Sequence, residues 1–428
     1  MTFWISAVDD RVKVAAAHSG LTDWESIITS RILRLHCDCM LPYNTFGWEL
    51  TTVGALIAPT PFLFVNCDDD LGFPMAGNRR IAERLRKIYS MYGRGDAFQD
   101  YVTHGPPGAH SYTADSRMAI FKWINHHLKG DDRLVTDVEE ERFPEEKLRV
   151  FPTDADIPKD VLNHVIDESF VPVAKVSVPP AGEFEPWRAQ KLQQLRELSF
   201  RTFPGRIAPA DKAPRPDEYR FVDWEREAGI QVWSTESGLL TSTTLHGFKS
   251  NEPPRDRLVT LVVVNEGESV SELPEWSAGL IAKDDPYAIL APRGVGLAAW
   301  TREPAHYIER AHSFIGRTID QGRVWDIASV GRHLNGDGPI RVIGRGQAGI
   351  LGAYAALFEP AIQEVVAVDP PASHASGPIF LNVLRVLDIP EALGMLAPRP
   401  LTLVNASDPA FQRTRGIYDR AGGRLLWK

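Results

Sequence analysis

Short runs of consecutive apolar residues alternate with amphipathic stretches near the N-terminus. Residues 12–17 and 61–66 are apolar runs bounded by polar residues or proline, a pattern that predicts buried strands. Residues 78–92 and 118–128 repeat apolar side chains at helical spacing, which predicts helices. Buried strands that alternate with helices predict a parallel sheet covered on both faces, and therefore an α/β fold.

The same alternation returns in residues 216–428, after a middle stretch of different character. Residues 131–215 hold charge runs and repeated prolines, which predict an extended connection with one helix at 187–198. Residues 229–244 predict antiparallel strand structure at the start of the C-terminal region. The core strands expected after it are residues 258–264, 287–290, 340–343, 365–368 and 401–404. The predicted division is therefore 1–130, 131–215 and 216–428, with α/β structure in the first and last parts.

Composition excludes several classes of protein. The 428 residues are 43% hydrophobic and 24% charged, as in ordinary globular proteins. The net charge is −9 without a basic cluster, so we expect no nucleic-acid partner. No apolar run approaches the roughly 18 residues of a membrane span, and the first residues lack the pattern of a signal peptide. Three cysteines cannot form a disulfide framework for a chain of this length.

The two α/β regions resemble each other in sequence. Residues 58–66 and 397–405 both read Ala-Pro-x-Pro followed by an apolar run that ends in Val-Asn, at an offset of 339 residues. Upstream, residues 10–14 match 360–365 at an offset of about 350 residues. Ala-Pro-x-Pro before a strand is also a common loop, so the alternative is a chance match. Two blocks in the same order favour an internal duplication.

The second region contains a tight glycine turn between a strand and a helix. The strand at 340–343 runs into Gly344-Arg345-Gly346-Gln347-Ala348-Gly349, and a helix is expected at 350–358. Strand, tight turn and helix form the layout of a nucleophile elbow. Transferred through the offset of about 350 residues, the matching turn of the first region falls before Met1. We therefore expect the chain to begin just after its own first elbow.

Three segments of the first region resemble the C-terminal half of an α/β-hydrolase domain of the acetyl xylan esterase / cephalosporin-C-deacetylase-like family. These segments are residues 2–12, residues 66–74 (Asn-Cys-Asp-Asp-Asp-Leu-Gly-Phe-Pro), and residues 108–112 (Gly-Ala-His-Ser-Tyr), which run into Phe-Lys-Trp at 121–123. The resemblance implies hydrolysis of a carbohydrate or other small carboxylic ester, without a cofactor. It also implies Asp70 as the triad acid, His110 as the base, and a serine nucleophile outside this chain.

The residues themselves leave alternatives open at this site. Asp70 follows a buried strand, at the sheet edge where such folds place function, but an Asp run there can also cap a helix. His110 lies in a loop rich in glycine and proline, where many histidines are simply exposed. His104 is its rival in the same loop. His126 and His127 belong to a predicted helix and are expected to be at its surface or partly buried.

The second region departs from the family pattern at each catalytic position. Gly346 stands where the resemblance places the nucleophile, with Gln347 beside it, and glycine has no nucleophilic atom. The counterpart of Asp70 is Pro409, with Asp408 beside it, and no histidine loop follows. We therefore predict that Gly346 and Gln347 form a vestigial elbow in a degenerate copy.

Other candidate chemistry in the chain is weaker. Cys37 and Cys39 with His36 and Asp38 offer one Cys-x-Cys pair, whereas a zinc site normally needs paired ligand sets, so no metal is predicted. Cys67 is a conceivable thiol nucleophile, and Ser19 a conceivable hydroxyl. A further short run, Arg-Gly-Val-Gly at 293–296, lacks the remaining spacing of a dinucleotide-binding loop, so no cofactor is predicted.

The function expected on this basis is that of a carboxylic-ester hydrolase, inactive or nearly so in this chain because the nucleophile is missing. One alternative is a non-catalytic protein that binds or scaffolds, and another is a peptidase of the same fold. The expected partner is a small-molecule or carbohydrate ester, with no nucleic acid and no membrane. A first sheet without its preceding strands should expose unpaired edges, so we also expect poor solubility.

Overall fold

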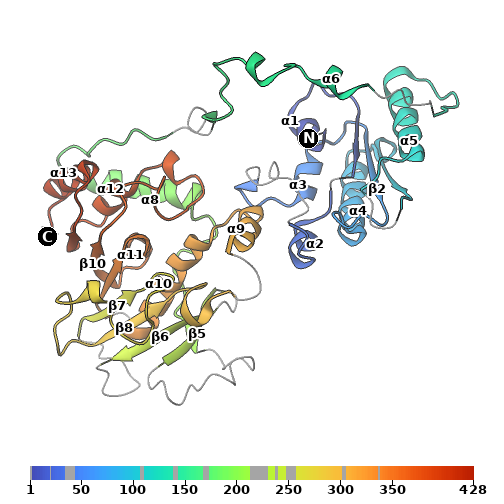
Figure 1. Cartoon of the computed structure of the whole chain (residues 1–428). Coiled ribbons are helices and arrows are strands. Elements are labelled where there is room, and N and C mark those ends of the chain that lie inside the picture. The colour runs from blue at the N-terminus through green and yellow to red at the C-terminus, as the bar shows by residue number, and fades with distance from the viewer. Residues whose placement is uncertain are drawn as a thin grey trace. The chain divides into compact units, whose positions relative to one another are not determined.

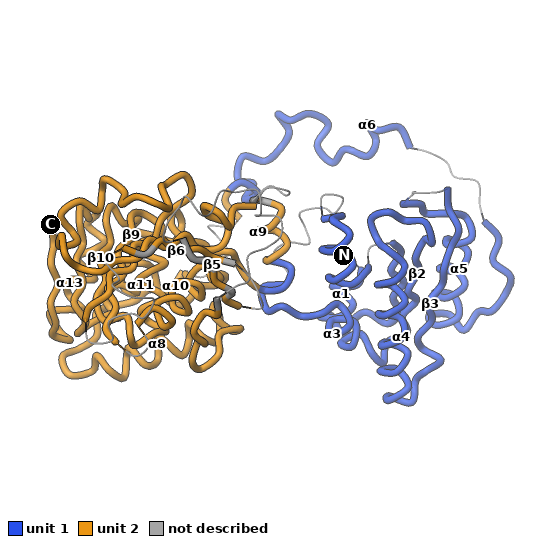
Figure 2. The backbone as a smooth tube through the Cα atoms, turned by 90° about the horizontal axis from the view of Figure 1, so that it is seen from below, with its two compact units in different colours: residues 1–164, 313–316 blue, residues 165–312, 317–428 orange. Residues whose placement is uncertain are grey.

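The computed structural model describes residues 2–19, 21–33, 44–106, 110–137, 143–166, 173–212, 230–236, 240–246, 257–300, 305–335 and 338–428. The chain divides into two compact units, shown in Figure 2. The first unit comprises residues 1–164 with 313–316, and the second comprises residues 165–312 with 317–428. Both are α/β, as predicted.

The first unit is built on three parallel strands that pair in the order β1-β2-β3. The strands are β1 (Ala15–His18), β2 (Phe62–Cys67) and β3 (Phe98–Thr103). The helices are α1 (Thr2–Val8), α2 (Trp24–Thr29), α3 (Leu50–Ala55), α4 (Met75–Met91), α5 (Ala114–Ile124) and α6 (Glu145–Leu148), and α5 continues as a π-helical turn, Asn125–Lys129. The first strand is shorter at its start than the apolar run 12–17 predicted, because pairing with β2 begins only at Ala15.

Helices cover both faces of this small sheet. Strand β2 is buried at every position, and its side chains alternate between the faces. Leu63 and Val65 pack against Trp123 of α5, while Phe62 contacts Phe98, which in turn contacts Tyr89 of α4. Figure 2 shows α4 and α5 on opposite sides of β2 and β3. The continuous apolar run of β2 therefore reflects burial on both faces.

The second unit is built on a larger, mostly parallel sheet (Figure 1). Its strands are β4 (Asp211–Lys212), β5 (Ile230–Ser234), β6 (Leu240–His246), β7 (Val259–Val263), β8 (Tyr287–Ala291), β9 (Ile340–Arg345), β10 (Ile362–Val368), β11 (Leu401–Val404) and β12 (Leu425–Trp427). They pair in the order β12-β11-β10-β9-β7-β8-β6-β5-β4. Strands β7 to β12 are parallel, and β4, β5 and β6 join at one side by antiparallel pairing, as the sequence predicted for 229–244.

The helices of the second unit are α8 (Phe184–Leu198), α9 (Ala305–Phe314), α10 (Ile319–Asn335), α11 (Gln347–Phe358), α12 (Ile389–Gly394) and α13 (Gln412–Ala421). The largest core cluster of this unit lies between the sheet and all of these helices except α9. Helix α11 is buried at nearly every position and packs on β9 and β10. Phe184 and Leu195 bring α8 into the same core, so part of the Pro-rich stretch 131–215 packs with the second unit. The predicted boundaries at 130 and 215 stay a prediction.

The three strands of the first unit match three strands of the second unit in order, direction and register. Ala15 of β1 pairs with Phe62 of β2, and Val365 of β10 pairs with Leu401 of β11. Ala15 and Val365 are 350 residues apart, and Phe62 and Leu401 are 339 residues apart. These are the offsets of the two matching sequence blocks. The Ala58–Pro59 and Ala397–Pro398 peptide bonds that precede β2 and β11 are both cis.

The described residues contain neither a membrane-spanning helix nor a cluster of metal ligands. None of the helices there is both long and apolar enough to cross a membrane. No group of three or more potential metal ligands comes together in that part of the chain.

Candidate active site

Three polar side chains gather where the parallel strands of the first unit end. His18 is the last residue of β1, Asp70 follows β2, and His110 lies beyond β3. The carboxyl ends of parallel strands meet at one edge of a sheet, which is where α/β folds place their ligands. The two residues expected from the sequence, Asp70 and His110, therefore reach the same edge from different strands.

Asp70 is held by the turn that follows β2. Its backbone N–H donates to the carbonyl of Cys67 at 3.4 Å, and its side chain is only 3% exposed. One carboxylate oxygen, Oδ1, accepts a hydrogen bond from the N–H of Gly72 at 2.8 Å. This bond fixes the carboxylate and leaves the other oxygen, Oδ2, for a second partner. The Asp70 carboxylate is therefore buried and bonded within this turn, and no side chain of the Asp run caps helix α4.

His110 is that second partner. Its Nδ1 lies 2.7 Å from Oδ2 of Asp70, and its side chain is 60% exposed. The ring of Phe73 lies beside the imidazole, with 5.4 Å between ring centroids. Because a carboxylate only accepts, Nδ1 carries the hydrogen and the Nε2 of the neutral ring is left with a lone pair. Among the described residues, Nε2 has no hydrogen-bonding partner.

The rival histidine pairs with a different carboxylate. His104 Nδ1 lies 2.6 Å from Oδ2 of Asp68, and the two side chains are 81% and 35% exposed. The hydrogen bond that His104 donates to Asp68 and the negative charge of that carboxylate raise the pKa of His104 above 6.5. Exposed pairs of this kind contribute little to stability. The sheet edge thus holds two Asp–His pairs, of which only Asp70–His110 has a buried acid.

His18 was not assigned a role from the sequence, although the end of a buried strand at this edge was a usable signal. Its Nε2 is buried without a hydrogen-bonding partner in the described part of the chain, and the ring of Tyr112 packs edge-on against it. Burial lowers the pKa of His18, and the nearby imidazole of His110 lowers it further, while Asp70 and Asp115 act in the opposite direction. A neutral imidazole therefore lies close to the Asp70–His110 pair.

The weaker candidates of the first unit are not placed as nucleophiles. The thiol of Cys67 is buried at the end of β2. Ser19 has a φ of 37°, and its hydroxyl is buried without a hydrogen bond to any described residue. His126 is exposed and pairs with Asp132, as expected for a surface position. The possible metal ligands, residues 36–39, lie outside the described residues.

In the second unit, the predicted turn lies between β9 and α11. Gly346 has φ 56° and ψ −125°, and its N–H donates to the carbonyl of Val368 at 2.8 Å. Helix α11 begins at Gln347, directly after the turn and earlier than the expected start at 350. A Cβ added at Gly346 meets nothing within 4 Å. The turn has the sharp strand-to-helix geometry of an elbow, with open space and no side chain at its tip.

Side chains fill the hydrogen-bonding positions beside this turn. Asn265, in the loop after β7, accepts from the N–H of Ala348 at 3.3 Å and donates to the carbonyl of Arg345 at 3.0 Å. The backbone N–H of Asn265 itself donates to the carboxylate of Glu268 at 2.6 Å. In α/β-hydrolases, the oxyanion of the transition state is bound by the N–H of the residue directly after the nucleophile, a position held here by Gln347, and by an N–H of the loop in which Asn265 lies. Here Ala348 and Asn265 donate to side chains of the same unit.

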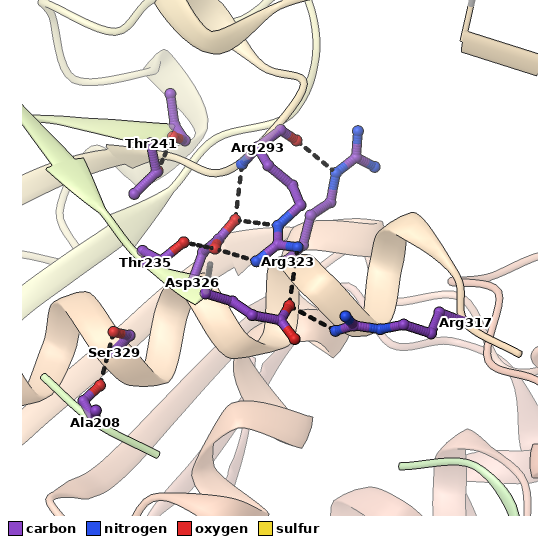
Figure 3. Close-up of polar contacts among 10 residues, drawn as sticks. Ala208, Thr235, Thr241, Arg293, Arg317, Arg323, Asp326 and Ser329 are labelled. Atoms are coloured by element: carbon purple, nitrogen blue, oxygen red, sulfur yellow. Dashed lines mark hydrogen bonds and ion pairs between the residues drawn. The ribbon is translucent and has the colours of Figure 1, made fainter. Parts of the chain in front are cut away.

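The remaining expected positions of the second unit have structural partners. Asp408, the neighbour of Pro409, accepts from the N–H of Ala410 at 2.8 Å and so caps a short helical turn. Arg293, from the glycine-containing run after β8, donates through Nε and Nη2 to Asp326 of α10 at 2.9 and 2.7 Å (Figure 3). Its guanidinium is therefore part of a buried ion pair with 4% and 0% exposure.

The strand order of the second unit, with a sharp turn that leads from a central strand into a buried helix, defines an α/β-hydrolase-like fold. No family model matches the chain. No curated protein matches it either.

Several solved structures resemble the chain at low identity. A Bacteroides fragilis protein assigned as an acetyl xylan esterase has a TM-score of 0.39 and 14% identity, over 57% of this chain and 75% of that one. Acetyl xylan esterase 1 from a Thermoanaerobacterium has a TM-score of 0.32 and 13% identity, over 59% and 88%. A glucuronoyl esterase from Sporotrichum thermophile has a TM-score of 0.37 and 12% identity, over 60% and 79%.

Proposed function

We propose that the first unit carries the acid and the base of a carboxylic-ester hydrolase, in the roles of Asp70 and His110. The observation that supports this best is the hydrogen bond between a buried carboxylate and Nδ1 of an exposed imidazole. An acid in this position holds the ring in the tautomer whose Nε2 can take a proton, and it stabilises the imidazolium that forms. The Asp68–His104 pair has the same chemistry but lacks the buried acid.

We also propose that the two units contain copies of one ancestral domain. The support is the shared register of β1–β2 and β10–β11 at the offsets that the sequence blocks show. The residues that follow β1 and β10, Ser19 and Asp369, both have a positive φ, 37° and 46°. A chance match between the two Ala-Pro-x-Pro loops would not explain why the neighbouring strands also share their pairing register and the positive φ of the residue that follows.

The second copy is non-catalytic in this proposal. Gly346 offers no nucleophilic atom, and the N–H of Asn265, in the loop that supplies one of the oxyanion donors, already donates to Glu268. Arg345 donates to Asp369 at 2.8 Å, and Asn405 donates to the other oxygen of that carboxylate at 2.9 Å. The carboxylate of Asp369, which follows β10, is thereby engaged in hydrogen bonds within the second unit.

The substrate class proposed for the first unit is a small carboxylic ester, with acetylated carbohydrates the class that the family resemblance implies. Ester hydrolysis by this route requires a hydroxyl whose proton Nε2 of His110 can accept. Among the described residues no hydroxyl is hydrogen-bonded to that nitrogen. We therefore expect this chain by itself to hydrolyse esters at a rate close to that of an unpaired imidazole in solution.

The experiment is the release of p-nitrophenol from p-nitrophenyl acetate, and of acetate from acetylated xylan, by the full chain. His110→Ala is the test variant and His104→Ala the matched control, since both remove an Asp-paired imidazole from the same loop. We expect near-background rates in all three proteins. Fast hydrolysis that only His110→Ala abolishes would confirm the base and overturn the claim that the nucleophile is missing. Fast hydrolysis that survives His110→Ala would overturn the assignment of the base.

A further inference from the structure

A cavity of about 700 Å³ lies in the second unit at the sheet edge opposite Gly346. Its walls include the end of α11, the residues that lead into β10 and β11, and one side of α8. The charged residues that line it are Arg188, Arg196, Arg206, Arg332, Arg399 and Glu359. Five guanidinium groups therefore share one cavity with a single carboxylate, in a chain whose net charge is −9.

The single carboxylate is fully engaged. Glu359 accepts from Nε of Arg332 at 2.8 Å and also from its Nη2. The other carboxylate oxygen accepts from the N–H of Ala361 at 3.0 Å. Both side chains of the pair are buried, at 6% and 2% exposure. Arg332 and Glu359 thus neutralise each other, and the lining offers no further carboxylate to Arg196 or Arg399.

Arg399 is the clearest case of an unneutralised cation. Its Nη1 donates to two backbone carbonyls, those of Ala356 and Ile362, the second at 3.0 Å. Its Nε and Nη2 form no hydrogen bond with the described residues, although neither atom is sealed off. Burial and the like charge of Arg188 lower the pKa of Arg399 below 12.5, while Tyr418 and Glu359 act in the opposite direction. Nearby positive charge and partial burial both disfavour the charged form of this guanidinium.

Two further arginines are held toward the cavity by neutral groups. Nε of Arg188 donates to the carbonyl of Met395 at 2.7 Å, and Nη1 of Arg196 donates to that of Pro204 at 3.1 Å. The guanidinium of Arg196 also lies over the ring of Phe358, 5.0 Å from its centroid. The nearest carboxylate to Arg188 is Glu185, at 4.0 Å and 71% exposed. Carbonyl and aromatic contacts position these cations, and the one carboxylate paired with Arg188 is largely exposed to solvent and neutralises it only weakly.

We propose that this cavity binds a small molecule that carries a phosphate or sulfate group. Guanidinium groups bind such oxyanions through paired N–H donors, and Arg399 retains three N–H groups for this purpose. A cavity of this volume matches those that hold small ligands, and Phe358 with Leu192 gives it an apolar part for a carbon skeleton. Helix capping alone explains one donor of Arg399 but not the convergence of Arg188, Arg196 and Arg399 around one space.

The test measures the binding of pyrophosphate to the full chain by isothermal titration calorimetry at low salt. Arg399→Gln should weaken the affinity at least about tenfold, because a charge-assisted pair of hydrogen bonds is lost. The matched control is Arg420→Gln, at an exposed arginine of α13 outside the cavity, and it should leave the affinity unchanged. The affinity should also fall as sodium chloride is added.

A second variant keeps the test decisive if Arg399→Gln does not fold. Arg196→Gln removes a half-exposed cation whose only backbone bond goes to Pro204, and it should also weaken pyrophosphate binding several-fold. No binding of pyrophosphate by the wild-type chain would overturn the proposal. Equal loss in Arg420→Gln, or tight binding of single-stranded RNA in place of pyrophosphate, would overturn it as well.

Discussion

Asp70→Ala should loosen the turn after β2, whereas Asp68→Ala should leave it intact. The Asp70 carboxylate is 3% exposed and joins two elements, through Gly72 at 2.8 Å and His110 at 2.7 Å. Its two partners regain water when it is removed, so each lost bond costs about 1 kcal/mol, and the total is roughly 2 kcal/mol. Asp68 is 35% exposed and pairs with a histidine that is 81% exposed, so its loss costs at most ~1 kcal/mol.

Hydrogen–deuterium exchange followed by mass spectrometry measures this difference in the full chain. A loss of roughly 2 kcal/mol accelerates exchange about thirtyfold in peptides that cover 68–75, because local opening controls exchange there. Asp68→Ala should accelerate it only a few-fold. Equal acceleration in both variants, or none in Asp70→Ala, would refute the inference that the buried carboxylate holds the turn.

Three further outcomes follow from the structure. Asp326→Ala removes the carboxylate that accepts from Nε and Nη2 of Arg293 and leaves Glu236, 3.3 Å from Nη1, as its remaining carboxylate partner, so urea titration should show the second unit destabilised by about 3 kcal/mol; a loss below ~1 kcal/mol would contradict this. Gly346→Ser should cost only about 1–2 kcal/mol in thermal unfolding, from backbone strain at φ 56° in open space, and should create no esterase activity. Asp68→Asn should lower the pKa of His104 in an NMR titration, because that pKa is raised by Asp68. The stabilisation from this pair is full below pH ~6.5 and is lost as the pH rises through the raised pKa, so an unchanged titration would contradict the pairing.

Local pattern was enough to predict the strands, whereas Asp70 and His110 were singled out by the family resemblance. The apolar runs at 61–66 and 401–404 are buried on both faces, so they predicted β2 and β11 to within a residue. The resemblance assigned Asp70 and His110 to one site, and the two side chains are hydrogen-bonded at the sheet edge. Their catalytic roles, and the vestigial role of Gly346, stay proposals.

Features that depend on long-range packing could not be predicted from local pattern. Arg293 looked like part of a ligand loop, and only the fold brings it to Asp326, 33 residues away. The arginine cavity joins Arg188 and Arg399, which no spacing rule connects. Likewise, the ring of Tyr112, which packs edge-on against His18, comes from the loop beyond another strand. In each case the partner is set by tertiary contacts and not by neighbouring residues.

The most direct test of the central claim is the tautomer of His110, measured by nitrogen-15 NMR on chain labelled at histidine and assigned with His110→Ala. The account predicts a hydrogen on Nδ1 and a bare Nε2 in the neutral ring, and a shift toward the other tautomer in Asp70→Asn but not in Asp68→Asn. A ring that carries its hydrogen on Nε2, or that is unaffected by Asp70→Asn, would contradict the proposal that Asp70 prepares His110 to act as a base.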